Sequence, residues 1–165
     1  MKLSTKQSQK GFTIIEVMIV LAIAGVIIAA VLVAVPQLQK NQRNTSRRAI
    51  LGRVKTELDN YIGNNNGSVP SNALFATGAT SFTTKYLNPA SSFTDPNGNA
   101  VTYDTYVAGG IHATPVTPTG NTAAGILYNS TATCSGEDVT GAGTSRQYAV
   151  SIGLEGGAAY CLDNK

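Results

Sequence analysis

The segment from Phe12 to Val35 is strongly apolar, and Glu16 is its one charged residue. Its 24 residues would form a helix about 36 Å long at about 1.5 Å per residue, enough to cross the hydrocarbon core of a bilayer, which is about 30 Å thick. An ordinary secretory signal has a shorter apolar core of roughly 7–15 residues. The length therefore predicts a membrane-spanning helix.

Glu16 is out of place in such a segment unless it has a partner, because burying a charge in lipid is costly and charged residues there usually serve a function. If the chain were cut after Gly11, the new amino group on Phe12 would lie about one helical turn from the Glu16 carboxylate. That amine has the opposite charge. A plain membrane anchor, the alternative, gives no reason for Glu16.

A short basic leader precedes this segment and ends in glycine. The pattern resembles the precursors of type IV pilins, in which a phenylalanine follows the glycine and an acid occupies the fifth helical place. The resemblance implies that a membrane peptidase cuts between Gly11 and Phe12 and methylates the Phe12 amine. It also implies that Glu16 pairs with that amine on a neighbouring subunit. The matching residues are Lys2, Lys6, Lys10, Gly11, Phe12 and Glu16.

Beyond Pro36 the apolar residues recur at three- and four-residue intervals, as on one face of an amphipathic helix. We expect this helix to continue the first one as far as Asn64, where an Asn-rich turn ends it. The predicted organisation is a leader (1–11), an apolar helix (12–35), an amphipathic helix (36–64) and a head (65–165). The repeating positions are Ile50, Val54, Leu58, and Tyr61 or Ile62.

Two residues are candidate bends in the long helix. Gly25 gives the backbone freedom, and Pro36 lacks a hydrogen-bond donor. The resemblance implies that this region of the helix melts locally in a filament. The family's usual proline position is occupied here by Val33. We expect the loosened segment between Gly25 and Pro36.

A basic run follows the membrane span. We favour a solvated face near anionic lipid headgroups over pairing with acids of neighbouring subunits, such as Asp59, because exposed ion pairs contribute only about 0–1 kcal/mol. Without the three leader lysines the chain has nine basic and nine acidic residues, so its charge does not indicate nucleic acid as a partner. The run comprises Lys40, Arg43, Arg47, Arg48, Arg53 and Lys55.

From residue 65 onward the composition favours a β-rich head, so the predicted fold class is α+β: a long N-terminal helix packed on a small antiparallel sheet. Turns are expected at Asp95-Pro96-Asn97-Gly98 and at Glu155-Gly156-Gly157. The tyrosines are expected in the sheet and core. The candidate strands are Val101–Val107, Gly125–Asn129, Gln147–Ile152 and Ala158–Leu162.

Both cysteines, Cys134 and Cys161, lie beyond the apolar segment, where an exported head meets oxidising surroundings. This context favours one disulfide, with two buried free thiols as the alternative. A disulfide near the end of the chain also resembles the closed terminal loop of many pilins. The Asp95–Gly98 turn resembles a segment of secretion pseudopilins, and we give it less weight.

No catalytic group, metal site or cofactor is expected in the head. His112 has no cysteine or carboxylate cluster near it in the sequence. Asp95, Asp104, Glu137 and Asp138 match no calcium-binding spacing. Three Asn-x-Ser/Thr sequences, at Asn44, Asn66 and Asn129, leave glycosylation open.

The resemblance implies a structural subunit of a type IV pilus that supports attachment or twitching motility, and not an enzyme. The implied partners are other copies of the chain, the prepilin peptidase and methyltransferase, a platform protein and assembly ATPases. The precursor would cross the inner membrane once with its head outside, and the assembled filament would be extracellular. The alternatives are a pseudopilin of a secretion or DNA-uptake system and a monomeric membrane-anchored binding protein.

Overall fold

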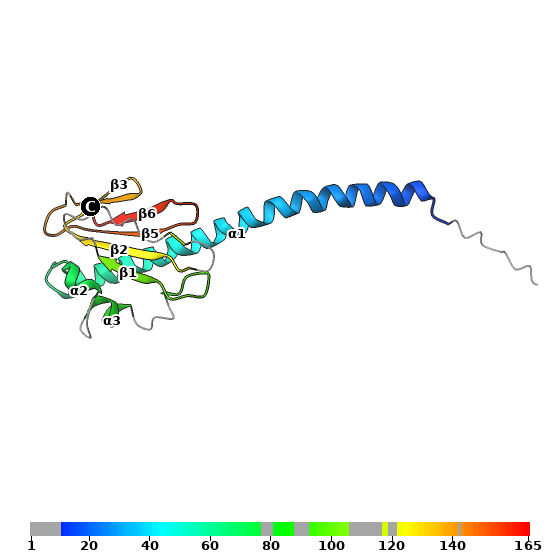
Figure 1. Cartoon of the computed structure of the whole chain (residues 1–165). Coiled ribbons are helices and arrows are strands. Elements are labelled where there is room, and N and C mark those ends of the chain that lie inside the picture. Colours follow the sequence, from blue (N-terminus) through cyan, green and yellow to red (C-terminus); the bar gives the residue numbers. More distant parts are fainter. Residues whose placement is uncertain (1–10, 77–80, 88–92, 106–116, 119–121, 142) are drawn as a thin grey trace, which may run out of the picture. The chain divides into compact units, whose positions relative to one another are not determined.

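A computed structural model describes residues 11–76, 81–87, 93–105, 117–118, 122–141 and 143–165 (Figure 1). The chain divides into two compact units, Met1–Gln39 and Lys40–Lys165. One helix, α1 (Ile14–Asn64), supplies residues to both units and includes Pro36. The predicted end of the helix at Asn64 is confirmed.

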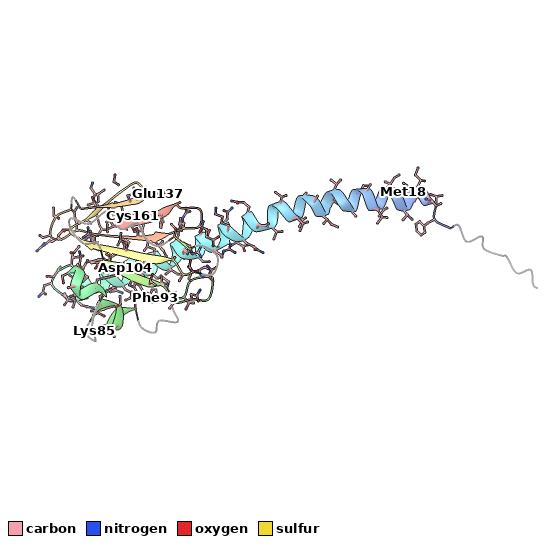
Figure 2. The ribbon with its side chains drawn as sticks, viewed as in Figure 1. Met18, Lys85, Phe93, Asp104, Glu137 and Cys161 are labelled. Atoms are coloured by element: carbon pink, nitrogen blue, oxygen red, sulfur yellow. A yellow bond between two sulfur atoms is a disulfide. The ribbon has the colours of Figure 1, made fainter. Side chains whose placement is uncertain are left out.

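In the first unit, α1 exposes its large apolar side chains. Phe12 is 90% exposed and Ile14 is 82% exposed, and the other large apolar residues as far as Leu38 are exposed as well. Figure 2 shows these side chains, Met18 among them, extending from the helix. By length and composition, α1 is apolar enough to cross a membrane. The bends at Gly25 and Pro36 stay a prediction.

The second unit contains a sheet of four strands in the order β1-β2-β5-β6. The strands β2, β5 and β6 pair antiparallel, as expected, whereas β1 runs parallel to β2. A parallel pair needs a connection of about a dozen residues or more, and β1 ends at Thr105 whereas β2 begins at Gly125. The four predicted strands are confirmed, and the sheet is mixed. Their bounds are β1 Thr102–Thr105, β2 Gly125–Ser130, β5 Tyr148–Gly153 and β6 Ala159–Asp163.

Four short elements were not predicted. Two helices lie between α1 and β1, and Ser81 caps the second one by accepting a hydrogen bond from the Thr84 N–H. A hairpin of two strands packs near β6, with Gly136 at positive φ in its turn. The elements are α2 Asn72–Ala76, α3 Phe82–Tyr86, β3 Thr133–Ser135 and β4 Asp138–Thr140. At three to five residues each, they are too short for periodicity to indicate them.

The core of the second unit lies between α1 and one face of the sheet. On the helix side, Leu51, Val54 and Leu58 have no exposed surface, and alternate residues of β2 and β5 belong to the same core cluster. This alternation is the period of two of a β-strand, whose successive side chains point to opposite faces of the sheet. The predicted apolar stripe is thereby confirmed.

Aromatic rings fill the end of the core where α1 stops. Phe75 stacks on Tyr128 with ring centroids 4.1 Å apart and on Phe82 at 5.4 Å. The Tyr148 hydroxyl donates to an Asp59 oxygen at 2.7 Å, and the Tyr128 hydroxyl donates to the Pro70 carbonyl. The expected core role of the tyrosines is confirmed for those described, and Tyr106 lies outside the described residues.

A disulfide joins Cys134 in β3 to Cys161 in β6, with their Cα atoms 5.8 Å apart. The two half-cystines pack beside Ala132, Val139 and Ala149 in a small second core. The bond therefore fixes the short hairpin to the edge of the main sheet.

Replacing both cysteines with alanine should lower the free energy of unfolding by about 3–4 kcal/mol, because the unfolded chain regains the freedom of a loop whose ends are 27 positions apart. Urea unfolding of the detergent-solubilised chain, followed by circular dichroism, measures the change. Reductant should lower the free energy of unfolding of the unchanged protein by a similar amount and leave that of the variant unaffected. Identical midpoints for the two proteins would contradict this role.

Candidate functional site

The first candidate site is the start of α1. Thr13 immediately precedes the helix, and Glu16 is its third residue, which is the spacing of an N-terminal capping box. The Thr13 backbone N–H donates to Glu16 Oε2 at 2.8 Å, and the Thr13 hydroxyl donates to the same oxygen at 2.7 Å. Within one chain, therefore, the Glu16 carboxylate already has two donors. Thr13 was not predicted as a site residue, although the Thr-x-x-Glu spacing in the sequence could have indicated it.

The bond between Gly11 and Phe12 lies just outside α1. Both residues are exposed and neither has helical structure, and nothing lies within 4 Å of the position that a Gly11 Cβ would take. A peptidase needs an extended, accessible segment. The local structure is therefore compatible with cleavage at this bond.

The second candidate site is a set of ion pairs in the second unit, which we call the helix–head clasp. Arg47 of α1 has no exposed surface. Its Nε and Nη2 donate to the two Asp95 carboxylate oxygens at 2.7 and 3.0 Å, and its Nη1 donates to Glu155 Oε1 at 2.9 Å. Paired bonds of this kind are the strongest ones that arginine makes with a carboxylate. The clasp consists of Arg43, Asn44, Arg47, Asp95 and Glu155.

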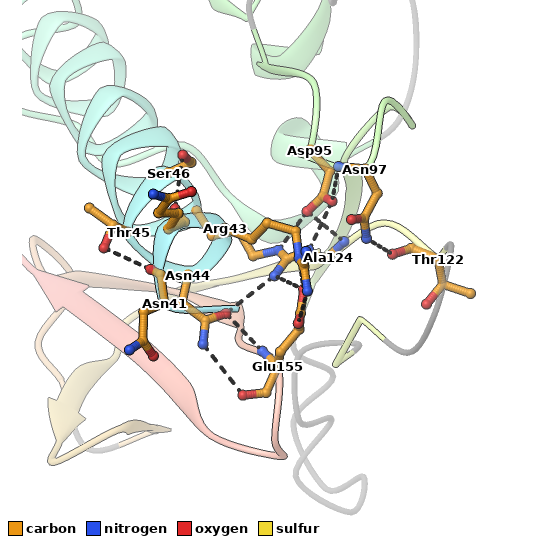
Figure 3. Close-up of polar contacts among 12 residues, drawn as sticks. Asn41, Arg43, Asn44, Thr45, Ser46, Asp95, Asn97, Thr122, Ala124 and Glu155 are labelled. Atoms are coloured by element: carbon orange, nitrogen blue, oxygen red, sulfur yellow. Dashed lines mark hydrogen bonds and ion pairs between the residues drawn. The ribbon is translucent and has the colours of Figure 1, made fainter. Parts of the chain in front are cut away.

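A second paired contact joins α1 to the turn between β5 and β6 (Figure 3). Arg43 donates to the two Glu155 oxygens at 2.6 and 2.8 Å. Asn44 Oδ1 accepts the Glu155 backbone N–H at 3.0 Å. Because Arg43, Asn44 and Arg47 lie within about one helical turn, a single face of α1 holds two loops of the head.

The turn that follows Phe93 holds Asp95 in place for Arg47. The Asn97 and Ala124 backbone N–H groups donate to the Asp95 carboxylate at 3.0 and 3.3 Å, and the Gly98 N–H donates to the Asp95 carbonyl at 2.8 Å. Gly98 has a φ of 86°, which glycine adopts without strain. The predicted turn is confirmed, and it also satisfies a buried charge.

The clasp favours the ionised carboxylates. The hydrogen bond from Arg43 lowers the pKa of Glu155 to about 2, and Arg47 contributes in the same direction. Burial alone would raise the pKa of Asp95, but the bonds from Arg47 and the Asn97 N–H bring it below its ordinary value. Both carboxylates are therefore charged at neutral pH.

The favoured interpretation of the basic run as a solvated face is wrong for Arg43 and Arg47. Two other cations of the run lie over aromatic rings: the Arg48 guanidinium is 5.3 Å from the Tyr160 centroid, and that of Arg53 is 4.8 Å from the Phe93 centroid. Lys55 pairs with Asp59 of the same helix at 2.9 Å. All of these contacts lie within one chain, and those of the four arginines give the run a role in attaching the head.

The residues considered for metal binding do not gather. Among the described residues, no group of three or more histidines, cysteines and carboxylates is placed to hold a metal ion. Asp95 belongs to the clasp. His112 lies outside the described residues.

Comparison with known families identifies the start of the chain. Residues 6–32 match the family described as the prokaryotic N-terminal methylation motif, which is the leader of type IV pilins and pseudopilins. Comparison with curated proteins and with solved structures gave no match. The motif confirms the resemblance over this segment and indicates the type IV pilin or pseudopilin family. It points to a structural protein whose precursor is anchored in a membrane.

Replacing Arg47 with alanine should lower the free energy of unfolding by about 3–5 kcal/mol, because the change leaves Asp95 buried without its counter-charge. Chemical denaturation of the detergent-solubilised chain measures this. Arg48→Ala, one position along the same helix, is the matched control and should cost about 1 kcal/mol or less. Equal losses in the two variants would contradict the importance of the clasp.

Stability should also fall in acid. Glu155 has a lowered pKa in the folded protein, so its contribution is complete above its unfolded value, about 4.3, and is lost as the pH falls toward about 2. Asp95 acts in the same direction. Melting temperatures measured between these limits should decline, and the decline should be shallower in Glu155→Gln. An identical pH profile for that variant would show that the clasp carboxylate does not contribute.

Proposed function

We propose that this chain is the structural subunit of a type IV pilus, and the observation that carries the proposal is the exposed apolar half of α1, most of which lies within the methylation motif. Such a surface is stable in two surroundings, the bilayer and a bundle of like helices. The subunit therefore assembles by transfer of this helix from the bilayer to the helix bundle.

The assembly step follows from the start of α1. Cleavage after Gly11 creates an amine on Phe12, and methylation leaves that amine basic. In the filament, the Phe12 amine of one subunit pairs with Glu16 of its neighbour. The carboxylate then has a counter-charge in an apolar bundle, where an isolated charge is unfavourable. Thr13 supports the ionised carboxylate before assembly, through its two hydrogen bonds.

The clasp prepares the head for the same assembly. Subunits form a regular filament only if each presents its head surface in the same way. Arg43 and Arg47 hold two head loops to the start of the second unit, so the lattice contacts are made by a preformed surface. Local melting between Gly25 and Pro36 would let the apolar part adapt without disturbing the clasp.

The partners in this proposal are other copies of the chain, the prepilin peptidase and methyltransferase, a platform protein and assembly ATPases. Before assembly, the precursor is anchored in the inner membrane with its head outside. The finished filament lies on the cell surface and supports attachment or twitching motility. A pseudopilin has the same leader motif. The disulfide near the end of the chain, which resembles the terminal loop of pilins, favours the pilus subunit.

Glu16→Ala should be cut between Gly11 and Phe12 as usual but should be largely missing from filaments sheared off the cells, because the neighbouring amine loses its counter-charge. N-terminal sequencing of membranes and immunoblots of the sheared fraction measure the two steps. Val17→Ala, the adjacent apolar position, is the control and should assemble normally. Normal filament yield from Glu16→Ala would overturn the pairing.

A further inference from the structure

Three asparagines in this chain start an Asn-x-Ser/Thr sequence, and the structure places them in very different surroundings. A sugar attached to asparagine replaces a hydrogen of the side-chain amide. The folded protein must therefore leave that nitrogen at the surface with open space around it. The three candidates are Asn44, Asn66 and Asn129.

Asn44 does not meet it. The residue lies within α1, and its side chain belongs to the clasp. Its Nδ2 donates to the Glu155 carbonyl at 3.4 Å, and its Oδ1 accepts from the Glu155 N–H at 3.0 Å and from Arg47 at 3.2 Å. A sugar on this nitrogen would have to displace the turn between β5 and β6.

Asn129 fails for a different reason. It lies inside strand β2, where it pairs with Ala149 of β5, and it is 4% exposed. Its side-chain oxygen accepts from Asn72 at 3.4 Å. No sugar fits beside a residue buried to this extent.

Asn66 meets the requirement. It lies in the turn that follows α1, with an exposed side chain and a φ of 55°. Gly67 continues the turn with a φ of 78° and nothing within 4 Å of its absent Cβ, and Ser68 is exposed. The asparagine and the hydroxyl residue of the sequence are therefore both accessible.

The turn does not need the Asn66 side chain. Backbone groups close the end of the helix: the Gly67 N–H donates to the Ile62 carbonyl at 2.9 Å, and the Ser68 N–H donates to the Asn65 carbonyl at 3.0 Å. A substituent on the Asn66 amide would extend into solvent while these bonds remain. The fold thus tolerates a modification here that it excludes at Asn44 and Asn129.

We infer that Asn66 is an N-glycosylation site of the exported head. The donor class is a lipid-diphosphate-linked oligosaccharide. The amide nitrogen attacks the anomeric carbon, the bond from that carbon to the diphosphate oxygen breaks, and the amide loses one proton. The inference rests on export of the head, which is part of the proposed function.

Peptide mapping of the protein from its native cells tests the site. The tryptic peptide of residues 56–85 should carry one or more sugar residues, and fragmentation should place them on Asn66. Ser68→Ala should abolish the added mass, whereas Ser68→Thr should retain it, because only threonine preserves the hydroxyl. Both changes are at an exposed residue, so neither should alter the fold.

An unmodified peptide in the wild-type protein would overturn the inference, as would added mass that survives Ser68→Ala or is released as an O-linked sugar by alkaline β-elimination. A mass change due only to deamidation of Asn66 would do the same. The amino terminus of the same protein separates the two proposals. Bare Asn66 on chains that start at Phe12 in sheared filaments refutes glycosylation alone, whereas uncut chains confined to membranes refute the pilus proposal.

Discussion

The apolar half of α1 is the constraint on which the account depends, because nothing in its own unit covers it. Large apolar side chains from Phe12 to Leu38 are exposed, and at roughly 25 cal/mol per Å² such a surface is strongly unfavourable in water. Such a surface is favourable only in lipid or against another apolar surface. The methylation motif over residues 6–32 indicates the type IV pilin or pseudopilin family.

The head depends on a different interaction, the burial of Arg47. A guanidinium without exposed surface is tolerated only when its donors are paired, and Asp95 and Glu155 accept from three of its nitrogens. Each acid comes from a glycine-containing turn that backbone hydrogen bonds hold in shape. The clasp thus links two loops that are distant in the sequence to a single face of α1 and fixes their position on the helix.

The parts of the molecule that were predictable are those specified by local pattern. The helix end at Asn64, the stripe through Val54 and Leu58 and four strands follow from periodicity and turn residues. The clasp could not be predicted, because Arg47 meets acids 48 and 108 positions away that appear in the sequence only as turn residues. The parallel pairing of β1 was missed since pairing direction depends on the path of the connection, and α2 and α3 are too short to show a period.

Intact mass combined with N-terminal sequencing, applied to protein sheared from the cell surface and to protein left in membranes, tests the central claim most directly. We expect a chain that begins with methylated Phe12 and is abundant in the sheared material. The same chain found only in membranes would contradict the filament and favour a pseudopilin. A chain that still begins with Met1 would contradict processing itself.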